Sequence, residues 1–163
     1  MVKVQREQWA SAQSEVLPLW QGEHAAETVA HCDSRLQVNP SLETLAKLED
    51  ANVLLVLTAR YGVQLVGYTL TIFLPDFSCQ HLLMANVMLH YVNPAFRGQG
   101  IARQLFTLLE AHAQVWHADA ILVGNKAHLH YGAVFEHMGY HPYGTTYIKW
   151  VDYEAQTPAE NET

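Results

Sequence analysis

Cysteine, basic residues and long apolar runs are scarce in this chain, and each scarcity excludes a class of protein. The 163 residues contain two cysteines, Cys32 and Cys79, which cannot form a disulfide framework and lack metal-ligand spacing. Nine basic against 16 acidic residues give a net charge of −7, which argues against a general affinity for nucleic acid. No apolar run is long enough to span a bilayer, and the first six residues carry no hydrophobic signal region. We therefore expect a cytoplasmic protein with no nucleic-acid or membrane partner.

The composition is typical of one folded domain followed by a polar tail. Half of the residues are hydrophobic, which at this length is enough to bury a substantial core. We expect this domain to cover residues 1–152. Residues 153–163 are acidic, lack hydrophobic periodicity and contain Pro158, which predicts a disordered tail.

Hydrophobic periodicity predicts alternating strands and helices along the domain. The expected helices cover residues 5–20, 22–32, 41–50, 101–116 and 131–138. The expected strands cover residues 2–4, 53–59, 63–73, 81–92, 120–123 and 143–151, with a turn at 60–62 and a loop at 74–80. Pro18 and Gly22 separate the first two helices, Ser41 caps the third, and Gly67 indicates a bulge in its strand.

The most informative segment joins the predicted strand 81–92 to the predicted helix 101–116. Gly98 and Gly100 remove side chains where a ligand would approach the main chain, and they permit φ values closed to other residues. The N–H groups of residues 99–103 would point out of the helix start, where the peptide dipoles favour an anion. Arg97 and Arg103 add positive charge. The segment therefore predicts a phosphate-binding loop.

This loop matches one known pattern and not two others. The dinucleotide fingerprint needs three glycines spaced G-x-G-x-x-G, and the nucleotide-triphosphate loop must end in G-K-[ST], and neither is present. Arg97, Gly100 and Ala102 instead fill the order arginine or glutamine, x, x, glycine, x, glycine or alanine. This order resembles the coenzyme A pyrophosphate loop of the GNAT superfamily of N-acetyltransferases. The Gly139-Tyr140 pair after the last predicted helix extends the resemblance, which covers roughly residues 53–151.

The resemblance implies an α/β fold in one domain. Its sheet would be mixed and mostly antiparallel, with one splayed parallel strand pair and helices on both faces. It also implies acetyl-CoA as co-substrate and no metal. The expected pyrophosphate loop consists of Arg97, Gly98, Gln99, Gly100, Ile101, Ala102 and Arg103.

The remaining cofactor contacts are expected on the two parallel strands. Main-chain groups of Leu89, Tyr91 and Val92 would bind the pantetheine arm and the thioester as an added strand does. Asn125 and Lys126 follow the other strand, on the side where ligand sites of α/β sheets form. For Lys126, an exposed loop without a ligand is the alternative interpretation.

The resemblance further implies that an amine attacks the thioester directly in a ternary complex. The acceptor would be a primary amine on a small molecule or a protein, and the acidic surface is compatible with such a cation. Homodimers are common in this fold, so a homodimer is expected by analogy. The segment from Lys126 to Lys149 is also similar to a GNAT subgroup of bacteriophage genomes, whose acceptors are undefined.

The residues that carry out catalysis in the family are only partly present. Members often use a strand glutamate as base, but this chain has no carboxylate between Asp76 and Glu110. We predict His90 as the base, beside Asn86, because an imidazole ordinarily titrates near neutral pH. The alternative is that His90 only fills a half-buried strand position. Strict strand alternation would place on one face Asn86, Met88, His90 and Val92.

The usual general acid is also replaced. The family places a tyrosine four residues before the Gly-aromatic pair, and Phe135 occupies that position here. Tyr131 lies one helical turn earlier on the same face, and we predict that its hydroxyl protonates the leaving thiolate. Packing of its ring against the sheet is the alternative.

Acceptor contacts and metal ligands are the least defined part of the sequence. Candidates for the acceptor wall are Glu15, Trp20, Glu23, His24 and the segment 143–147. Ten histidines are present, but no cysteine or carboxylate cluster accompanies them, so we predict no metal site. The missing glutamate and Phe135 also keep open a non-catalytic acyl-CoA-binding or regulatory module, and a structural protein with a fortuitous loop.

Overall fold

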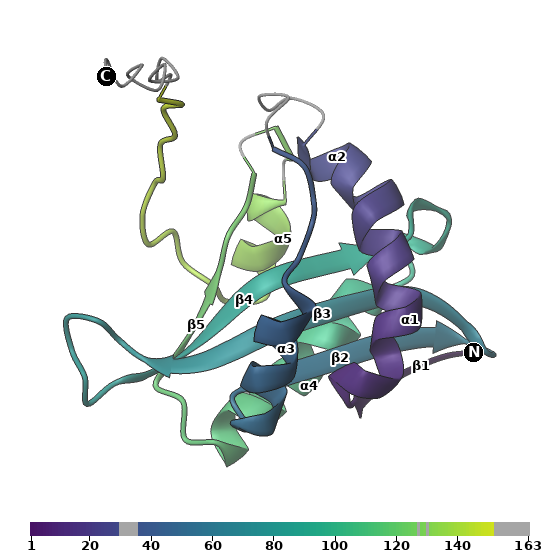
Figure 1. Ribbon diagram of the computed structural model, residues 1–163. Coiled ribbons are helices and arrows are strands. Elements are labelled where there is room, and N and C mark those ends of the chain that lie inside the picture. The colour runs from purple at the N-terminus through teal and green to yellow at the C-terminus, as the bar shows by residue number, and fades with distance from the viewer. Residues whose placement is uncertain (30–35, 127, 130, 152–163) are drawn as a thin grey trace, which may run out of the picture.

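The structure is a computed structural model that describes residues 1–29, 36–126, 128–129 and 131–151 (Figure 1). Three sequence-based predictions lie wholly or partly outside these residues. They are the end of the second helix at residues 30–32, the thiol of Cys32, and the disordered tail at 153–163.

One five-stranded sheet organises the chain, in the order β1-β2-β3-β4-β5. The strands are β1 (Val2–Glu7), β2 (Leu54–Tyr61), β3 (Gln64–Pro75), β4 (Leu83–Val92) and β5 (Ala120–Val123). Neighbours from β1 to β4 are antiparallel, whereas β4 and β5 are parallel. The expected mixed, mostly antiparallel sheet with one parallel pair is therefore confirmed.

Helices cover both faces of this sheet, as the pattern of apolar residues predicts (Figure 1). On one face, α1 (Trp9–Leu19) and α3 (Leu42–Asp50) bury apolar side chains against β2 and β3. On the other, α4 (Ile101–Val115) and α5 (Gly132–His137) enclose a second core around Phe106. Ser41 caps α3 by accepting a hydrogen bond from the Thr44 amide, as predicted.

The first helix differs from the prediction at its start and at its end. Residues 5–7 continue β1, because each pairs with a residue of β2, and α1 begins only at Trp9. Pro18 lies inside α1, and the chain continues without a break through a π-helical turn, η1 (Trp20–His24), into α2 (Ala25–Val29). A π-helical turn inserts an extra residue without ending the helix. The predicted break between the first two helices is therefore a π-helical turn within a continuous helical segment.

Irregular pairing occurs twice in the sheet, and the bulge in β4 has the larger consequence. In β3 the shift lies at Val66, next to the predicted Gly67. In β4, Leu89 pairs with Leu70 while Val87 pairs with Thr71, so Met88 is the extra residue. Side chains before and after Met88 therefore exchange faces.

The parallel pair separates immediately before this bulge. β5 pairs with β4 only from Met84–Ala120 to Val87–Val123, whereas β4 continues to Val92. Among the described residues, the second half of β4 has no partner strand on that side. The expected splay is thus present, and on this side the main chain of residues 88–91 has no strand to pair with among the described residues.

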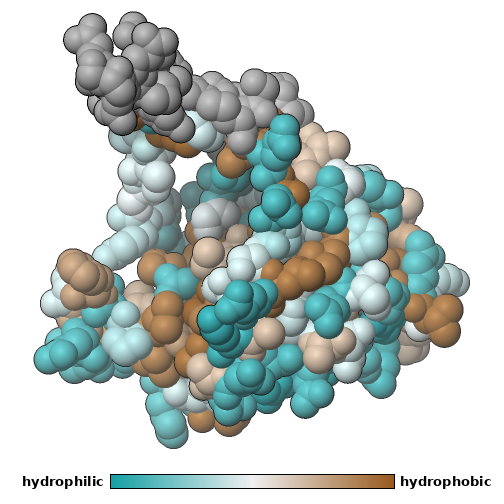
Figure 2. Space-filling view, viewed as in Figure 1, coloured by the Kyte–Doolittle hydropathy of each residue, from teal (hydrophilic) through white to brown (hydrophobic). Residues whose placement is uncertain are grey.

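The predicted final strand at residues 143–151 is wrong. The helix before it ends as expected, with Gly139 at a φ of 88°, but residues 140–151 form neither helix nor strand. Tyr143, Tyr147 and Ile148 are largely exposed, and the segment extends away from the sheet (Figures 1 and 2). β5 lies at the end of the described sheet, yet this segment does not pair with it, so the alternation of apolar residues is by itself insufficient to form a strand.

Replacing Gly67 by alanine should destabilise the fold. A Cβ at this position would lie 2.9 Å from the Tyr91 carbonyl oxygen of β4, so the strands would have to move apart. We expect a loss of about 1–3 kcal/mol, typical of overpacking, measured by thermal or urea unfolding. Gly144→Ala is the control, because no atom lies within 4 Å of its added Cβ. Equal stability of the two variants would contradict the close strand approach.

Candidate active site

The loop before α4 has the conformation that its glycines predict. Residues Pro94–Phe96 form a short 3-10 turn, closed by the Asn93 side chain, which accepts a hydrogen bond from the Ala95 amide. Gly98 and Gly100 then adopt φ values of 77° and 75°, in the left-handed region that favours glycine. The loop is exposed from residue 97 to residue 100.

The start of α4 presents main-chain donors to this exposed loop. Gly100 precedes the helix without a side-chain cap, and its carbonyl accepts from the Gln104 amide at 3.0 Å. This is the first hydrogen bond within the helix. The amides of Ile101, Ala102 and Arg103 come before Gln104 in the chain, so the helix offers them no carbonyl acceptor. An anion is stabilised at such a helix start by the N–H groups and by the peptide dipoles.

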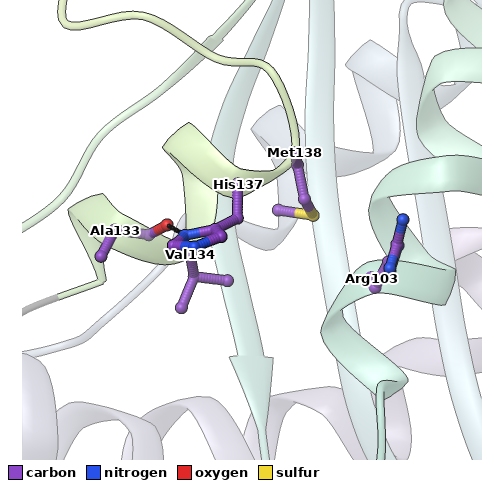
Figure 3. A pocket seen from close by; sticks show the side chains of 5 residues that line it. All are labelled: Arg103, Ala133, Val134, His137 and Met138. Atoms are coloured by element: carbon purple, nitrogen blue, oxygen red, sulfur yellow. Dashed lines mark hydrogen bonds between the residues drawn. The ribbon is translucent and has the colours of Figure 1, made fainter.

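A hollow of about 350 Å³ lies beside this helix start, between α4 and α5. Arg103 lies across it from side chains of α5 (Figure 3). The side chains opposite Arg103 are Ala133, Val134 and His137 of α5, and Met138 directly after it. Sequence reasoning missed these four residues as candidate ligand contacts, although their spacing places them on one face of a helix.

Arg97, a predicted phosphate ligand, already has partners in the structure. Its Nη2 donates to both carboxylate oxygens of Glu27 at 2.7 Å, and its Nε donates to the Val92 carbonyl at 2.8 Å. Glu27 belongs to α2 and was not among the predicted site residues. No local pattern could have identified it, because 70 residues separate it from Arg97.

His90 and Tyr131 are brought together, as their predicted roles require. Their ring centroids are 6.1 Å apart, and the His90 ring also contacts Phe106 and Phe135 edge-on at 6.0 and 5.4 Å. Burial among these rings lowers the pKa of His90 to about 4. The imidazole is therefore neutral at pH 7, and His90 is a weaker base than a solvent-exposed histidine.

Asn86 does not share a face with His90, which corrects the strict alternation expected from the sequence. Asn86 pairs across the sheet with Ile72 on the α1 side, whereas His90 contacts Phe106 on the α4 side. The bulge at Met88 is the cause, because one extra residue reverses the alternation. The Asn86 amide instead donates to the Met84 carbonyl at 3.2 Å.

A second polar cluster lies under η1 and α2, on the opposite face of β4. The Tyr91 hydroxyl donates to Glu23 at 2.7 Å, and the buried His24 Nδ1 lies 2.7 Å from the Tyr68 hydroxyl. Burial, with smaller effects of His90 and Arg97, lowers the pKa of His24 to about 4. Glu23 and His24 thus contact side chains of β4 and β3, and both remain candidates for the acceptor wall.

The other predicted wall and loop residues are placed less centrally. Glu15 forms an ion pair with Arg60 at 2.9 Å, which gives it a structural partner on β2. Trp20 is partly buried and packs against the core on the α1 side of the sheet. Residues 143–147 are exposed and belong to the irregular segment 140–151. Asn125 and Lys126 are exposed in the loop that follows β5.

The described residues contain neither a metal centre nor a membrane-spanning helix. No group of three or more histidine, cysteine or acidic side chains among them is arranged to hold a metal ion. No helix in the described part of the chain combines the length and the apolar character needed to cross a membrane.

Comparison with known families identifies the class to which this fold and loop belong. The profile of the acetyltransferase (GNAT) family matches residues 9–140, which is most of the chain. The chain therefore belongs to the GNAT family of acetyltransferases, enzymes that transfer an acetyl group from acetyl-CoA. A comparison with curated protein sequences finds no match. The resemblance to a bacteriophage-type subgroup receives no support from these comparisons.

Solved structures share the fold at low sequence identity. An aminoglycoside acetyltransferase, HMB0005, from an uncultured soil metagenomic sample superposes with a TM-score of 0.71 at 17% identity, over 93% of this chain and 99% of that one. The ribosomal-protein-alanine N-acetyltransferase of Brucella melitensis biovar Abortus 2308 gives 0.69 at 20%, over 94% and 99%. A predicted acetyltransferase with acetyl-CoA from Clostridium acetobutylicum gives 0.66 at 14%, over 94% and 96%.

Acid should destabilise the protein through the buried His24 and the half-buried His90. Because the pKa values of His24 and His90 fall from 6.5 to about 4 on folding, the unfolded chain binds more protons between these values. Their contribution to stability is therefore complete above about pH 6.5 and is lost as the pH falls toward 4. NMR titration should give both imidazoles midpoints near 4, assigned with the variants His24→Gln and His90→Gln. A midpoint near 6.5 for His90 would show that its ring is solvated.

Proposed function

We propose that this chain binds acetyl-CoA along β4, α4 and α5 and transfers the acetyl group to a primary amine. The observation that supports this most is the loop with two left-handed glycines at the start of α4. The loop lies between the unpaired part of β4 and the hollow beside α5. Pantetheine would bind along β4, the phosphates at the loop and adenosine at the hollow.

The pantetheine arm would follow the second half of β4. Val87 is the last residue of β4 that pairs with β5, so the main chain around Leu89, Tyr91 and Val92 lies where the two strands diverge. An extended arm with amide groups can bond to such an open strand edge. Residues 98–103 would hold the pyrophosphate, and Arg103 would direct its charge toward the hollow.

The reaction would be a direct attack of the amine on the thioester. A C–N bond forms, the C–S bond breaks, the amine loses a proton and the thiolate gains one. His90 is neutral at pH 7 and would accept the amine proton, while Tyr131 would protonate the sulfur. With a pKa of about 4, His90 supplies a modest driving force, so orientation of the two substrates contributes most.

The acceptor is proposed as an amine of a small molecule or a protein. By their names, the similar structures include enzymes that act on aminoglycosides and on the alanine of a ribosomal protein, and both kinds of acceptor carry amines. In this chain, Glu23 lies in the polar cluster under α2, and a carboxylate there favours a cationic acceptor.

Gly100→Glu should abolish tight binding of acetyl-CoA. The substitution strains a backbone position with φ of 75° and places a carboxylate in the proposed anion site, so we expect at least a roughly tenfold weaker Kd by calorimetry. Gly62→Glu is the matched control, because Gly62 also has positive φ but lies in the β2–β3 turn. Unchanged binding in Gly100→Glu would refute the placement of the phosphates.

Turnover separates the enzyme from a binding module. We expect release of free CoA when the protein and acetyl-CoA are mixed with at least one member of a panel of aminoglycosides, polyamines and peptides with free N-termini. His90→Gln and Tyr131→Phe should each lower that rate by about 10²-fold, the usual lower limit for loss of a general acid or base. Binding of acetyl-CoA without release of CoA from any acceptor would favour the non-catalytic alternative.

A further inference from the structure

Helix α2 is attached to both sides of the gap between the splayed strands, and Glu27 makes two of the attachments. Its carboxylate binds Arg97 in the loop after β4, and its main-chain carbonyl lies 2.8 Å from His128 Nε2, beyond β5. One turn earlier, Glu23 accepts hydrogen bonds from Tyr91 and Asn93. The helix beside the proposed acceptor wall thus contacts the proposed cofactor loop directly.

The bond between Glu27 and Arg97 conflicts with the proposed role of Arg97. A guanidinium has five N–H donors, and three are used here, one from Nε to Val92 and two from Nη2 to Glu27. A bidentate contact with a phosphate uses either Nε with Nη2 or Nη1 with Nη2, and both pairs include the Nη2 that donates to Glu27. Arg97 therefore cannot hold Glu27 and a phosphate through these donors at once.

We propose that Glu27 competes with the pyrophosphate of acetyl-CoA for Arg97, so that cofactor binding releases the end of α2. This inference rests on the proposed function, because it assumes that the phosphates bind at the loop. The pair is open to exchange, since 38% of the Arg97 side chain and 25% of the Glu27 side chain are exposed. A pyrophosphate carries more charge than one carboxylate, which favours the exchange.

Release of Glu27 would couple the two halves of the site. The Glu27 carboxylate would lose its cation, and the last turn of α2 would keep only the contact between the Glu27 carbonyl and His128 among those described above. Glu23 would still tie the preceding turn to Tyr91 and Asn93. Cofactor binding would then loosen residues 25–29 and leave α1 unchanged, and by linkage a looser α2 would favour the cofactor.

A double-mutant cycle measured by calorimetry with acetyl-CoA tests the competition. Glu27→Gln removes the competing charge, and because partly exposed ion pairs are worth little, the Kd should tighten by about two- to fivefold. Arg97→Ala should weaken binding, and adding Glu27→Gln to Arg97→Ala should then change nothing. Glu43→Gln on α3 is the control for the loss of one negative charge, because Glu43 pairs with Lys47 on its own helix.

Each outcome of the cycle decides one question. If wild type does not bind acetyl-CoA, the proposed function fails. If wild type binds and Glu27→Gln has an equal or weaker affinity, only the competition is overturned. The competition would also be overturned if Glu27→Gln tightened binding equally in the Arg97→Ala background, or if Glu43→Gln tightened binding as much. In either case the higher affinity would come from the loss of negative charge in general.

Hydrogen exchange tests the release of α2 directly, which an affinity measurement cannot do. With saturating acetyl-CoA, the amides of residues 25–29 should exchange several-fold faster in wild type, while those of α1 stay unchanged. In Glu27→Gln the same amides should exchange rapidly with or without acetyl-CoA. Slower exchange of residues 25–29 on binding would overturn the release of α2.

Discussion

The extra residue Met88 in β4 is the constraint on which the rest of the site depends. Before it, Ala85 and Val87 face α4, and after it, His90 faces the same helix while Leu89 and Tyr91 face α1. The pairing of β4 with β5 also stops at Val87, immediately before the bulge. One inserted residue thus separates the parallel strands and assigns the polar residues of β4 to two different layers.

Charge at the cofactor loop is balanced by a distant part of the chain. The conformation of the two glycines and the start of α4, on which the proposed anion site rests, follow from local sequence alone, because they depend only on φ values and on the first amides of a helix. The charge of Arg97, in contrast, is compensated by Glu27 on α2. If the proposed competition holds, the affinity for an anionic cofactor is a difference between two interactions, and α2 contributes to it although it lies outside the loop.

The environment of His90 shows how burial changes the chemistry of a correctly located residue. Its position on the central strand was predicted from the sequence, whereas its proximity to Tyr131 is a finding of the structure. Its pKa was not predicted, because Phe106 and Phe135 remove water from the ring and penalise the charged imidazole. The residue type suggested a base tuned for neutral pH, whereas the packing makes its conjugate acid much stronger.

The sequence by itself determined the features that depend on local physics. The Gly98 and Gly100 loop, the cap at Ser41, the start of α4 and the Gly139 helix stop each follow from backbone conformation within a few residues. Only the tertiary structure decided the rest: the faces of Asn86 and His90, the partner of Arg97, and the loss of the strand at 143–151. These features depend on strand register, on burial and on pairing with another strand, which are set by residues far apart in the chain.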